Sequence, residues 1–210
     1  MKINLAEPIF ESIQGEGKNI GYPAVFIRTS GCNVHCVLCD TKYSWGEGRE
    51  VDIEEELKKF KNRHLVITGG EPLLWQNRWR EFVKKHPDYF IEFETNGTIK
   101  PKIKNVQYNV SPKFGAIAGK DFVNLDVLKE FKKYNSYFKF VIRDEKDWER
   151  MEEIIKLVNL PKERIYVMPE GWKDRVIRKH AKKFIKKIIE RGYKLSMRAQ
   201  IWMWGRKRGV

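Results

Sequence analysis

The sequence predicts an α/β fold of about six parallel strands, either a partial (β/α) barrel or a doubly wound sheet. Three observations lead to this prediction. Short β-branched segments alternate with amphipathic helical segments along the 210 residues. The predicted strands are too few for a closed eight-stranded barrel. Cysteine-rich or glycine-rich sequences follow several of these strands, and ligand sites of parallel α/β folds form where strands meet the loops after them.

The alternation begins with a strand at residues 24–29 (AVFIRT). A charged helix is predicted at 52–61, and a buried strand at 64–68 (HLVIT) then ends at two glycines. The remaining elements are helices at 74–85, 125–133, 146–158 and 173–191, and strands at 89–94, 106–110, 137–142, 164–168 and 193–197. No repeat or linker interrupts the pattern, so we expect one domain over residues 1–210.

The composition bears on the partners and the location of the protein. The net charge is +14, but it is spread along amphipathic segments, so we interpret it as a solvated surface and expect no direct nucleic-acid partner. No apolar run reaches the roughly 18 residues of a membrane helix. The N-terminus has no apolar signal-peptide core. We therefore expect a cytoplasmic protein without a membrane partner.

The only three cysteines, Cys32, Cys36 and Cys39, lie within eight residues in a C-x3-C-x2-C pattern. An odd number cannot pair fully as disulfides. Three thiolates can hold three irons of a [4Fe-4S] cluster and leave the fourth iron open for a ligand. One alternative is a zinc site that adds His35, although four ligands in so short a segment would be cramped. Another is that the cysteines are structural.

A second motif, TGGEP at residues 68–72, directly follows a predicted strand. Its two glycines let the backbone approach a ligand closely. The Glu71 carboxylate can accept hydrogen bonds from an ammonium group. The alternative interpretation is a strand-to-helix turn with proline in the first helical turn.

The cysteine loop and the GGEP motif together resemble those of the radical S-adenosylmethionine (SAM) enzymes. That resemblance implies a radical-SAM-type partial barrel. It also implies that SAM binds the open iron and yields a 5′-deoxyadenosyl radical. Further motifs resemble, in order and over nearly the whole chain, the 7-carboxy-7-deazaguanine synthase family. They are FESIQGEG at 10–17, FIR at 26–28, CDT at 39–41, ETNGT at 94–98, SPK at 111–113 and the tail at 204–210.

This resemblance implies a lyase that converts 6-carboxy-5,6,7,8-tetrahydropterin to 7-carboxy-7-deazaguanine and ammonia, on the route to the 7-deazapurines queuosine and archaeosine. It implies that Mg²⁺ assists and that SAM is regenerated. It also implies an electron donor of the flavodoxin or ferredoxin type and a homodimer. The alternatives are another small radical SAM enzyme, such as an activase, or a basic zinc-binding RNA module, which would be a colourless protein rather than a brown one.

The resemblance also implies roles for single residues. Cys32, Cys36 and Cys39 would hold the cluster, and Thr41 would bind Mg²⁺. The expected SAM contacts are Leu38, Asp40, Gly70, Glu71, Glu94, Ser111, Pro112, Lys113, Met168, Pro169, Glu170 and Gly171. The expected substrate contacts are Ile13, Gln14, Gly15, Glu16, Arg28, Thr68 and Val210.

Elementary chemistry supports several of these roles and leaves alternatives. Arg28 can pair bidentately with a substrate carboxylate, or it can form a structural ion pair. The polar segment 14–17 matches the donors and acceptors of a pterin edge, or it is a polar turn. The Thr41 hydroxyl is a hard ligand of the kind that Mg²⁺ accepts, although threonine is common in turns.

Two positions depart from the family pattern. The family usually has Gln where this chain has Met168, so a backbone contact is expected there rather than a side-chain contact. A Gln-x-His pattern is common where this chain reads Gln200-Ile201-Trp202. Any role of that histidine is therefore absent or taken by an aromatic ring. We expect Trp202 and Trp204 to pack in the core.

Overall fold

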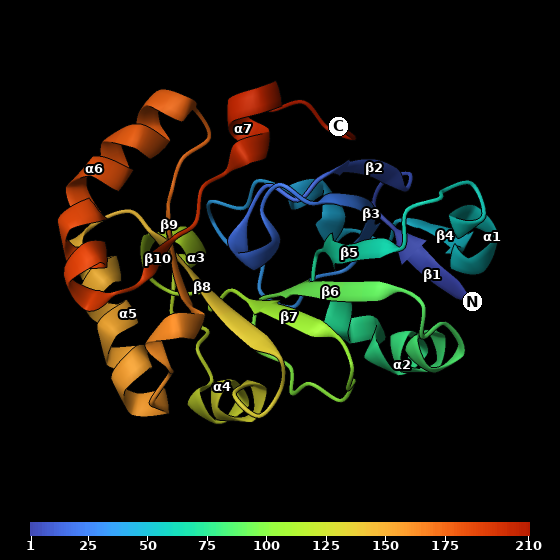
Figure 1. The fold of residues 1–210 in the computed structure, drawn as a ribbon, viewed down its shortest axis with the longest axis horizontal. Coiled ribbons are helices and arrows are strands. Elements are labelled where there is room, and N and C mark those ends of the chain that lie inside the picture. The colour runs from blue at the N-terminus through green and yellow to red at the C-terminus, as the bar shows by residue number, and fades with distance from the viewer.

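Parallel strands form the centre of the fold in the computed structural model, which describes residues 1–210 (Figure 1). The ten-stranded sheet has the order β10-β9-β8-β7-β6-β5-β3-β1-β4, with β2 paired to β3. The parallel strands are β3 (Pro23–Thr29), β5 (His64–Gly69), β6 (Phe90–Thr95), β7 (Gln107–Val110), β8 (Ser136–Ile142), β9 (Ile165–Pro169) and β10 (Lys194–Leu195). These are the strands that the sequence predicts, and the predicted fold class is confirmed.

Antiparallel strands that the sequence did not indicate extend one side of this sheet. They are β1 (Lys2–Leu5), β2 (Phe10–Ile13) and β4 (Arg49–Asp52). Each has four residues, which is too short for a clear period-two pattern. Since β2 pairs with β3, it brings the segment that follows it next to the parallel strands.

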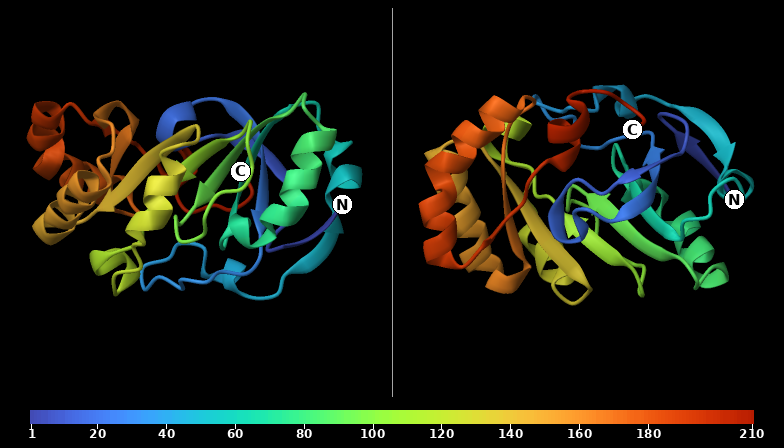
Figure 2. Two further views of the ribbon diagram at one scale, coloured as in Figure 1. Left: turned by 90° about the horizontal axis from the view of Figure 1, so that it is seen from below. Right: turned by 45° about the horizontal axis from the view of Figure 1, so that its top comes forward.

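Helices follow the outer side of the curved sheet (Figures 1 and 2). The longer ones are α2 (Gln76–Lys85), α4 (Leu125–Phe131), α5 (Glu145–Val158) and α6 (Asp174–Arg191). Helix α1 (Ile53–Leu57) is shorter than the predicted 52–61. Its first turn is capped by the Asp52 side chain, which accepts from the Glu54 N–H at 3.1 Å. No helix is both long and apolar enough to cross a membrane.

Short helical segments complete the fold. The helices α3 (Gly115–Ala118) and α7 (Ala199–Trp204) were not predicted. The 3-10 turns are η1 (Gly17–Asn19), η2 (Lys42–Trp45), η3 (Pro72–Trp75) and η4 (Lys162–Arg164). The predicted helix at 74–85 therefore begins as η3 and continues as α2. Trp202 on α7 is 69% exposed and Trp204 is half-buried, so the prediction that both pack in the core is wrong.

The main hydrophobic core fills the space between the sheet and the outer helices. Its aromatic rings form a continuous series, with Trp79 against Phe93 at 6.2 Å, Phe93 against Tyr108 at 5.7 Å, and Tyr108 against Phe131 at 5.3 Å between ring centroids. These contacts join α2, β6, β7 and α4. Rings at such distances add to the stabilisation that burial of their area provides.

The opposite face of the same strands is polar. Alternate residues of a strand point to opposite faces. On β6, Ile91 and Phe93 belong to the core, while Glu92 and Glu94 point the other way. Buried parallel strands usually carry apolar residues on both faces. The buried charges on the inner face therefore indicate a polar interior, in which a functional site can form.

Trp79 provides a test of the core. Replacing Trp79 with Ala should lower the free energy of unfolding by about 3–5 kcal/mol, because a fully buried indole is lost. Replacing it with Phe should cost clearly less, since the indole N–H has no hydrogen-bond partner and only volume is removed. Urea denaturation of both variants measures the difference. Equal losses would contradict this account.

Candidate active site

A cavity of about 610 Å³ lies where the parallel strands end, and it gathers most of the predicted site residues. Those that line it are Ile13, Gln14, Gly15, Glu16, Arg28, Cys32, Cys36, Leu38, Cys39, Asp40, Thr41, Thr68, Gly70, Glu94, Ser111, Lys113, Met168, Glu170 and Val210. Four predicted residues, Glu71, Pro112, Pro169 and Gly171, do not line it. Its volume is in the range of small-molecule sites.

The cysteine loop follows β3 and presents three free thiols to this cavity. The Leu38 N–H donates to the Ile117 carbonyl at 3.0 Å, which ties the loop to α3. Burial raises the pKa of the Cys36 thiol, and the Lys113 charge opposes that shift. The His35 ring packs on Trp45 and does not line the cavity, so it does not complete a zinc site.

No three His, Cys, Asp or Glu side chains lie close enough together to hold a single metal ion. A cubane cluster requires a different arrangement, because each thiolate ligates a different iron. Three free thiols that face one cavity are the donor set that such a cluster needs.

The cysteine loop and the GGEP loop are joined through their main chains. The Gly70 N–H donates to the Thr29 carbonyl at 3.0 Å, and the Glu71 N–H donates to the Gly31 carbonyl at 2.8 Å. A Cβ atom at Gly70 would lie 1.9 Å from the Gly31 carbonyl oxygen. Only glycine permits this approach.

The Glu71 carboxylate points away from the cavity and is fully buried. It accepts hydrogen bonds from the Leu73 N–H at 3.0 Å, the Thr95 hydroxyl at 2.8 Å and the Asn96 N–H at 2.7 Å. The side chain thus caps η3 and ties it to the end of β6. This geometry matches the strand-to-helix turn that was the alternative interpretation of the motif.

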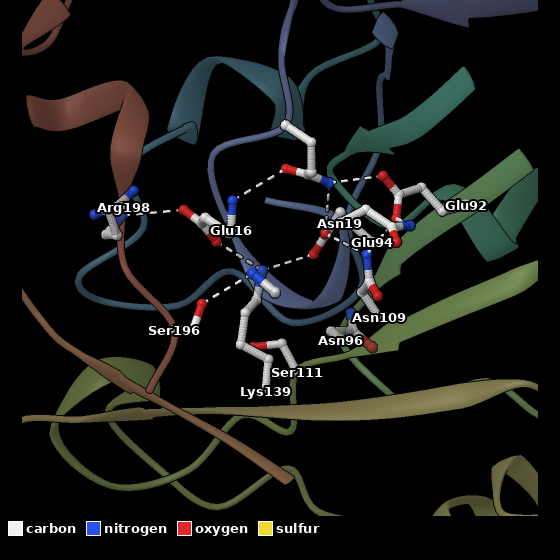
Figure 3. A network of polar contacts seen from close by, with 12 residues as sticks. Glu16, Asn19, Glu92, Glu94, Asn96, Asn109, Ser111, Lys139, Ser196 and Arg198 are labelled. Carbon is white, nitrogen blue, oxygen red and sulfur yellow. Dashed lines mark hydrogen bonds and ion pairs between the residues drawn. The ribbon is translucent and has the colours of Figure 1, made fainter. Parts of the chain in front are cut away.

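The predicted substrate segment, residues 13–16, is bound to the inner face of the sheet through its polar side chains, of which Glu16 is seen in Figure 3. Gln14 is buried and donates to Glu92 at 2.9 Å, while its own amide oxygen accepts from the Glu16 N–H at 3.3 Å. Glu92 is fully buried and is also bound by His64 and by the amides of three further residues, Asn19, Gln107 and Asn109.

Lys139 on β8 lies between two carboxylates of this site (Figure 3). Its Nζ donates to Glu16 at 2.6 Å and to Glu94 at 2.8 Å. Burial alone would lower the pKa of Lys139, but the charges of Glu16 and Glu94 outweigh it and raise this pKa. Burial alone would raise the pKa of Glu16, but Lys139 and Arg198 hold it well below its usual range. Burial raises the pKa of Glu94, although Lys139 opposes this.

Arg198, just before α7, is the second cation on Glu16. Its Nε donates to Glu16 at 3.0 Å, its Nη1 to the Gly171 carbonyl at 2.8 Å, and its Nη2 to Asp40. Gln200 also donates to Glu16, at 2.6 Å. Neither Lys139 nor Arg198 was predicted from the sequence. A lone lysine within the apolar strand segment FKF was the one local signal, and nothing near Arg198 indicated its role.

Arg28 forms an ion pair with Glu7 through its Nε. Glu7 also accepts from the Tyr43 hydroxyl at 3.3 Å. The structural ion pair that was the alternative for Arg28 is therefore present. Arg28 nevertheless lines the cavity, so it remains within reach of a ligand.

The C-terminal segment, residues 205–210, lines the cavity from the other side. The Arg208 guanidinium lies 3.8 Å from the centre of the Tyr43 ring, and Arg206 lies 4.9 Å from that of Trp172. These two cation–π contacts hold the tail against the cysteine loop region and the loop after β9.

Comparison with known proteins agrees with this site. The sequence pattern of the radical SAM superfamily matches residues 26–159, which include the cysteine loop and the GGEP loop. The fold and the three-thiol cavity therefore define a radical SAM enzyme. That class implies a [4Fe-4S] cluster, SAM, a small-molecule substrate and a reductant.

Individual relatives define the family more narrowly. The 7-carboxy-7-deazaguanine synthase of Pyrobaculum aerophilum is 33% identical over 96% of this chain and 95% of its own. That of Aquifex aeolicus is 33% identical over 92% and 89%. A crystal structure of QueE from Escherichia coli superposes with a TM-score of 0.76 at 27% identity, covering 94% of each chain. The chain belongs to the 7-carboxy-7-deazaguanine synthase family, whose members are radical SAM lyases of 7-deazapurine biosynthesis.

The contact between Lys139 and its carboxylates predicts a pH-dependent stability. Replacing Lys139 with Met should lower the free energy of unfolding by about 3–5 kcal/mol at pH 7, because two buried carboxylates lose a shared cation. The folded-state pKa of Glu16 is lowered, so its stabilisation is present above its unfolded pKa of about 4.3 and is lost as the pH falls through the folded value. The loss caused by the substitution should therefore shrink below about pH 4.3.

Urea denaturation between pH 3 and pH 8 measures this effect. The raised pKa of Lys139 adds no change in that window, since its contribution is lost only above its unfolded pKa of about 10.4. Replacing the exposed Lys133, which pairs with Glu130 on the surface, should change little and serves as the control. A loss for the Lys139 variant that stays constant with pH would contradict the coupling.

Proposed function

We propose that the chain converts 6-carboxy-5,6,7,8-tetrahydropterin to 7-carboxy-7-deazaguanine and ammonia by a radical-initiated, Mg²⁺-assisted ring contraction. The observation that carries this proposal is the shared cavity. The cysteine loop, the segment 13–16, Arg28 and Thr41 line one space and not separate ones. The product and ammonia together contain all the atoms of the substrate, so the conversion has no net oxidation and SAM can be regenerated.

The cluster and SAM would occupy the half of the cavity that the cysteine loop and the GGEP loop form. Cys32, Cys36 and Cys39 would hold three irons, and the open iron would take the amino and carboxylate groups of SAM. When bound, they would supply the 5′-deoxyadenosyl radical that abstracts hydrogen from the substrate. The Glu71 carboxylate has three internal donors, so we assign the contact to the SAM amino group to carbonyls of the 68–71 loop.

Residues at other strand ends complete the proposed SAM site. Lys113 donates to the Ser111 hydroxyl at 2.7 Å, and the pair lies beside the cysteine loop in the cavity. Ser111, Lys113 and Glu94 would hold the ribose and carboxylate of SAM. Residues 168–171 at the end of β9 would lie beside the adenine, with direct backbone contacts from Met168 and Glu170 and with Pro169 and Gly171 holding that segment in place. Leu38 and Asp40 would shape the remaining wall, and Pro112 would support it from behind.

The substrate would lie in the half of the cavity formed by residues 13–16, Arg28 and Thr68. The Gln14 and Glu16 side chains are already bound within the fold, so their part is to fix the backbone groups that face the pterin. Glu7 holds the Nε of Arg28, which leaves the two terminal nitrogens for a bidentate pair with the substrate carboxylate. Val210 would close the site from the tail.

Thr41 and the expected partners also belong to this proposal. The Thr41 hydroxyl faces the cavity 3.5 Å from the Cys39 sulfur and would give Mg²⁺ one hard ligand, with water and substrate oxygens supplying the rest. An electron donor of the flavodoxin or ferredoxin type would reduce the cluster. A homodimer, one domain over residues 1–210 and a cytoplasmic location complete the proposal.

Anaerobic turnover tests the proposed reaction. Reconstituted protein with 6-carboxytetrahydropterin, SAM, Mg²⁺ and a reductant should give 7-carboxy-7-deazaguanine and one equivalent of ammonia, identified by mass spectrometry. Replacing Cys36 with Ala should abolish turnover, because one cluster anchor is lost. Absence of this product from protein with a full cluster would refute the substrate assignment, and full activity of the Cys36 variant would refute the cluster assignment.

Replacing Thr41 with Ala tests the metal ligand. The variant should keep its cluster but need a higher Mg²⁺ concentration for half-maximal turnover, by about tenfold if one ligand worth roughly 1.4 kcal/mol is lost. A Mg²⁺ titration of the rate measures the shift. Thr98 does not line the cavity, although its hydroxyl donates to the lining residue Asn96, and it provides a control substitution. An unchanged Mg²⁺ requirement would count against Thr41 as a ligand.

A further inference from the structure

We propose that Arg198 is a positioning residue that holds the substrate segment in register with the cysteine loop, so that radical formation stays coupled to conversion of the substrate. This inference rests on the proposed function. Arg198 lines the cavity but belongs to none of the motifs seen in the sequence, and its three partners lie 27, 158 and 182 residues away. Its contacts join Glu16, Asp40 and the carbonyl of Gly171.

The three partners of Arg198 lie next to strands that are far apart in the sheet. Glu16 precedes β3, Asp40 follows β3, and Gly171 follows β9. In the sheet order, β9 and β3 are separated by β8, β7, β6 and β5, and β10 beyond β9 does not pair with β2 or β3. No ladder of strand hydrogen bonds therefore links these loops across the open side of the partial barrel, and Arg198 does.

Further hydrogen bonds close to Arg198 join residues 15–17 to residues 196–200. The Ala199 N–H donates to the Gly15 carbonyl at 2.9 Å, and the Gly17 N–H donates to the Ser196 hydroxyl at 2.9 Å. Gln200 adds a bond to Glu16. The part of the chain that leads into the C-terminal tail is thus bound directly to the substrate segment.

The chemistry of the guanidinium explains why an arginine occupies this position. Its planar, fixed donors can reach a carboxylate on each side and a carbonyl at once, whereas the ammonium of a lysine is a single point on a flexible stem. The Arg198 side chain is only 10% exposed, so these bonds are shielded from water. Figure 3 shows it on the opposite side of Glu16 from Glu92 and Glu94.

Loss of Arg198 should move the substrate segment without unfolding it. Glu16 would keep Lys139 and Gln200, so its charge would remain paired. The cysteine loop and the GGEP loop would stay joined through Gly31 and Gly70. A displacement of about 1 Å between reacting groups can cost about 100-fold in rate, so radicals would form but fewer would convert substrate.

The test compares Arg198→Gln and Arg198→Lys with wild type, and uses Arg178→Gln as the matched control. Arg178 forms an exposed ion pair with Asp174 on α6, away from the cavity. The measurements are iron content, SAM affinity by equilibrium binding, KM and kcat for 6-carboxytetrahydropterin, and the ratio of released 5′-deoxyadenosine to product.

For Arg198→Gln we expect a full cluster, SAM affinity within about twofold of wild type and a KM at least about tenfold higher, the effect of losing roughly 1.4 kcal/mol of positioning. The ratio of 5′-deoxyadenosine to product should rise. Arg198→Lys should recover part of the loss, and Arg178→Gln should match wild type. Gln200→Ala should shift the same quantities in the same direction by less, because it removes one neutral donor from the same carboxylate.

Several outcomes would overturn the inference. An unchanged KM and an unchanged ratio in Arg198→Gln would do so, as would a loss confined to SAM affinity, which would make Arg198 part of the SAM site. If Arg198→Gln loses its cluster, Arg198→Lys and Gln200→Ala decide by the same two readouts. If the wild-type protein forms no 7-carboxy-7-deazaguanine, the proposed function is contradicted. This failure differs from failure of the Arg198 inference, because it is seen without any substitution.

Discussion

The parallel pairing of β3 with β5, and of β5 through to β9, determines where most of the candidate functional groups lie. It brings the ends of β3, β5, β6, β7 and β9 to one edge, so loops that are far apart in sequence line one cavity. The two faces of the same strands differ in character. One face carries the aromatic core against the helices, and the other carries the carboxylates and amides beneath the cavity.

The polar inner face constrains geometry more than it adds stability. Burying charges costs several kcal/mol per ion, and their mutual attraction offsets this only when every donor and acceptor is matched. Here Glu92 is surrounded by side-chain donors, and Lys139 is shared by Glu16 and Glu94. These hydrogen bonds can all be made in few conformations of the side chains. They therefore hold the segment after β2 in one conformation.

The features that could be predicted from the sequence are those that depend on residues close together in the chain. Periodicity placed the parallel strands within one or two residues, and the strand ends then indicated most of the cavity. The strands β1, β2 and β4 are too short to show a period. Lys139 and Arg198 could not be found because their partner Glu16 lies 123 and 182 residues away. For Glu71, the same local motif fits a ligand contact or a cap, and only the fold shows which groups its carboxylate binds.

The main-chain contact between Gly31 and Gly70 differs from the contacts that hold the rest of the cavity wall. The two kinds of contact tolerate amino-acid substitutions to different degrees. Where the cysteine and GGEP loops meet, the geometry depends on main-chain atoms, so it is independent of side-chain identity as long as the glycines remain. The segment 13–17 and the tail are held by side-chain ion pairs and cation–π contacts, each of which can be altered singly. Variation and selection can therefore remodel the walls formed by residues 13–17 and the tail, while the joined cysteine and GGEP loops are inherited intact.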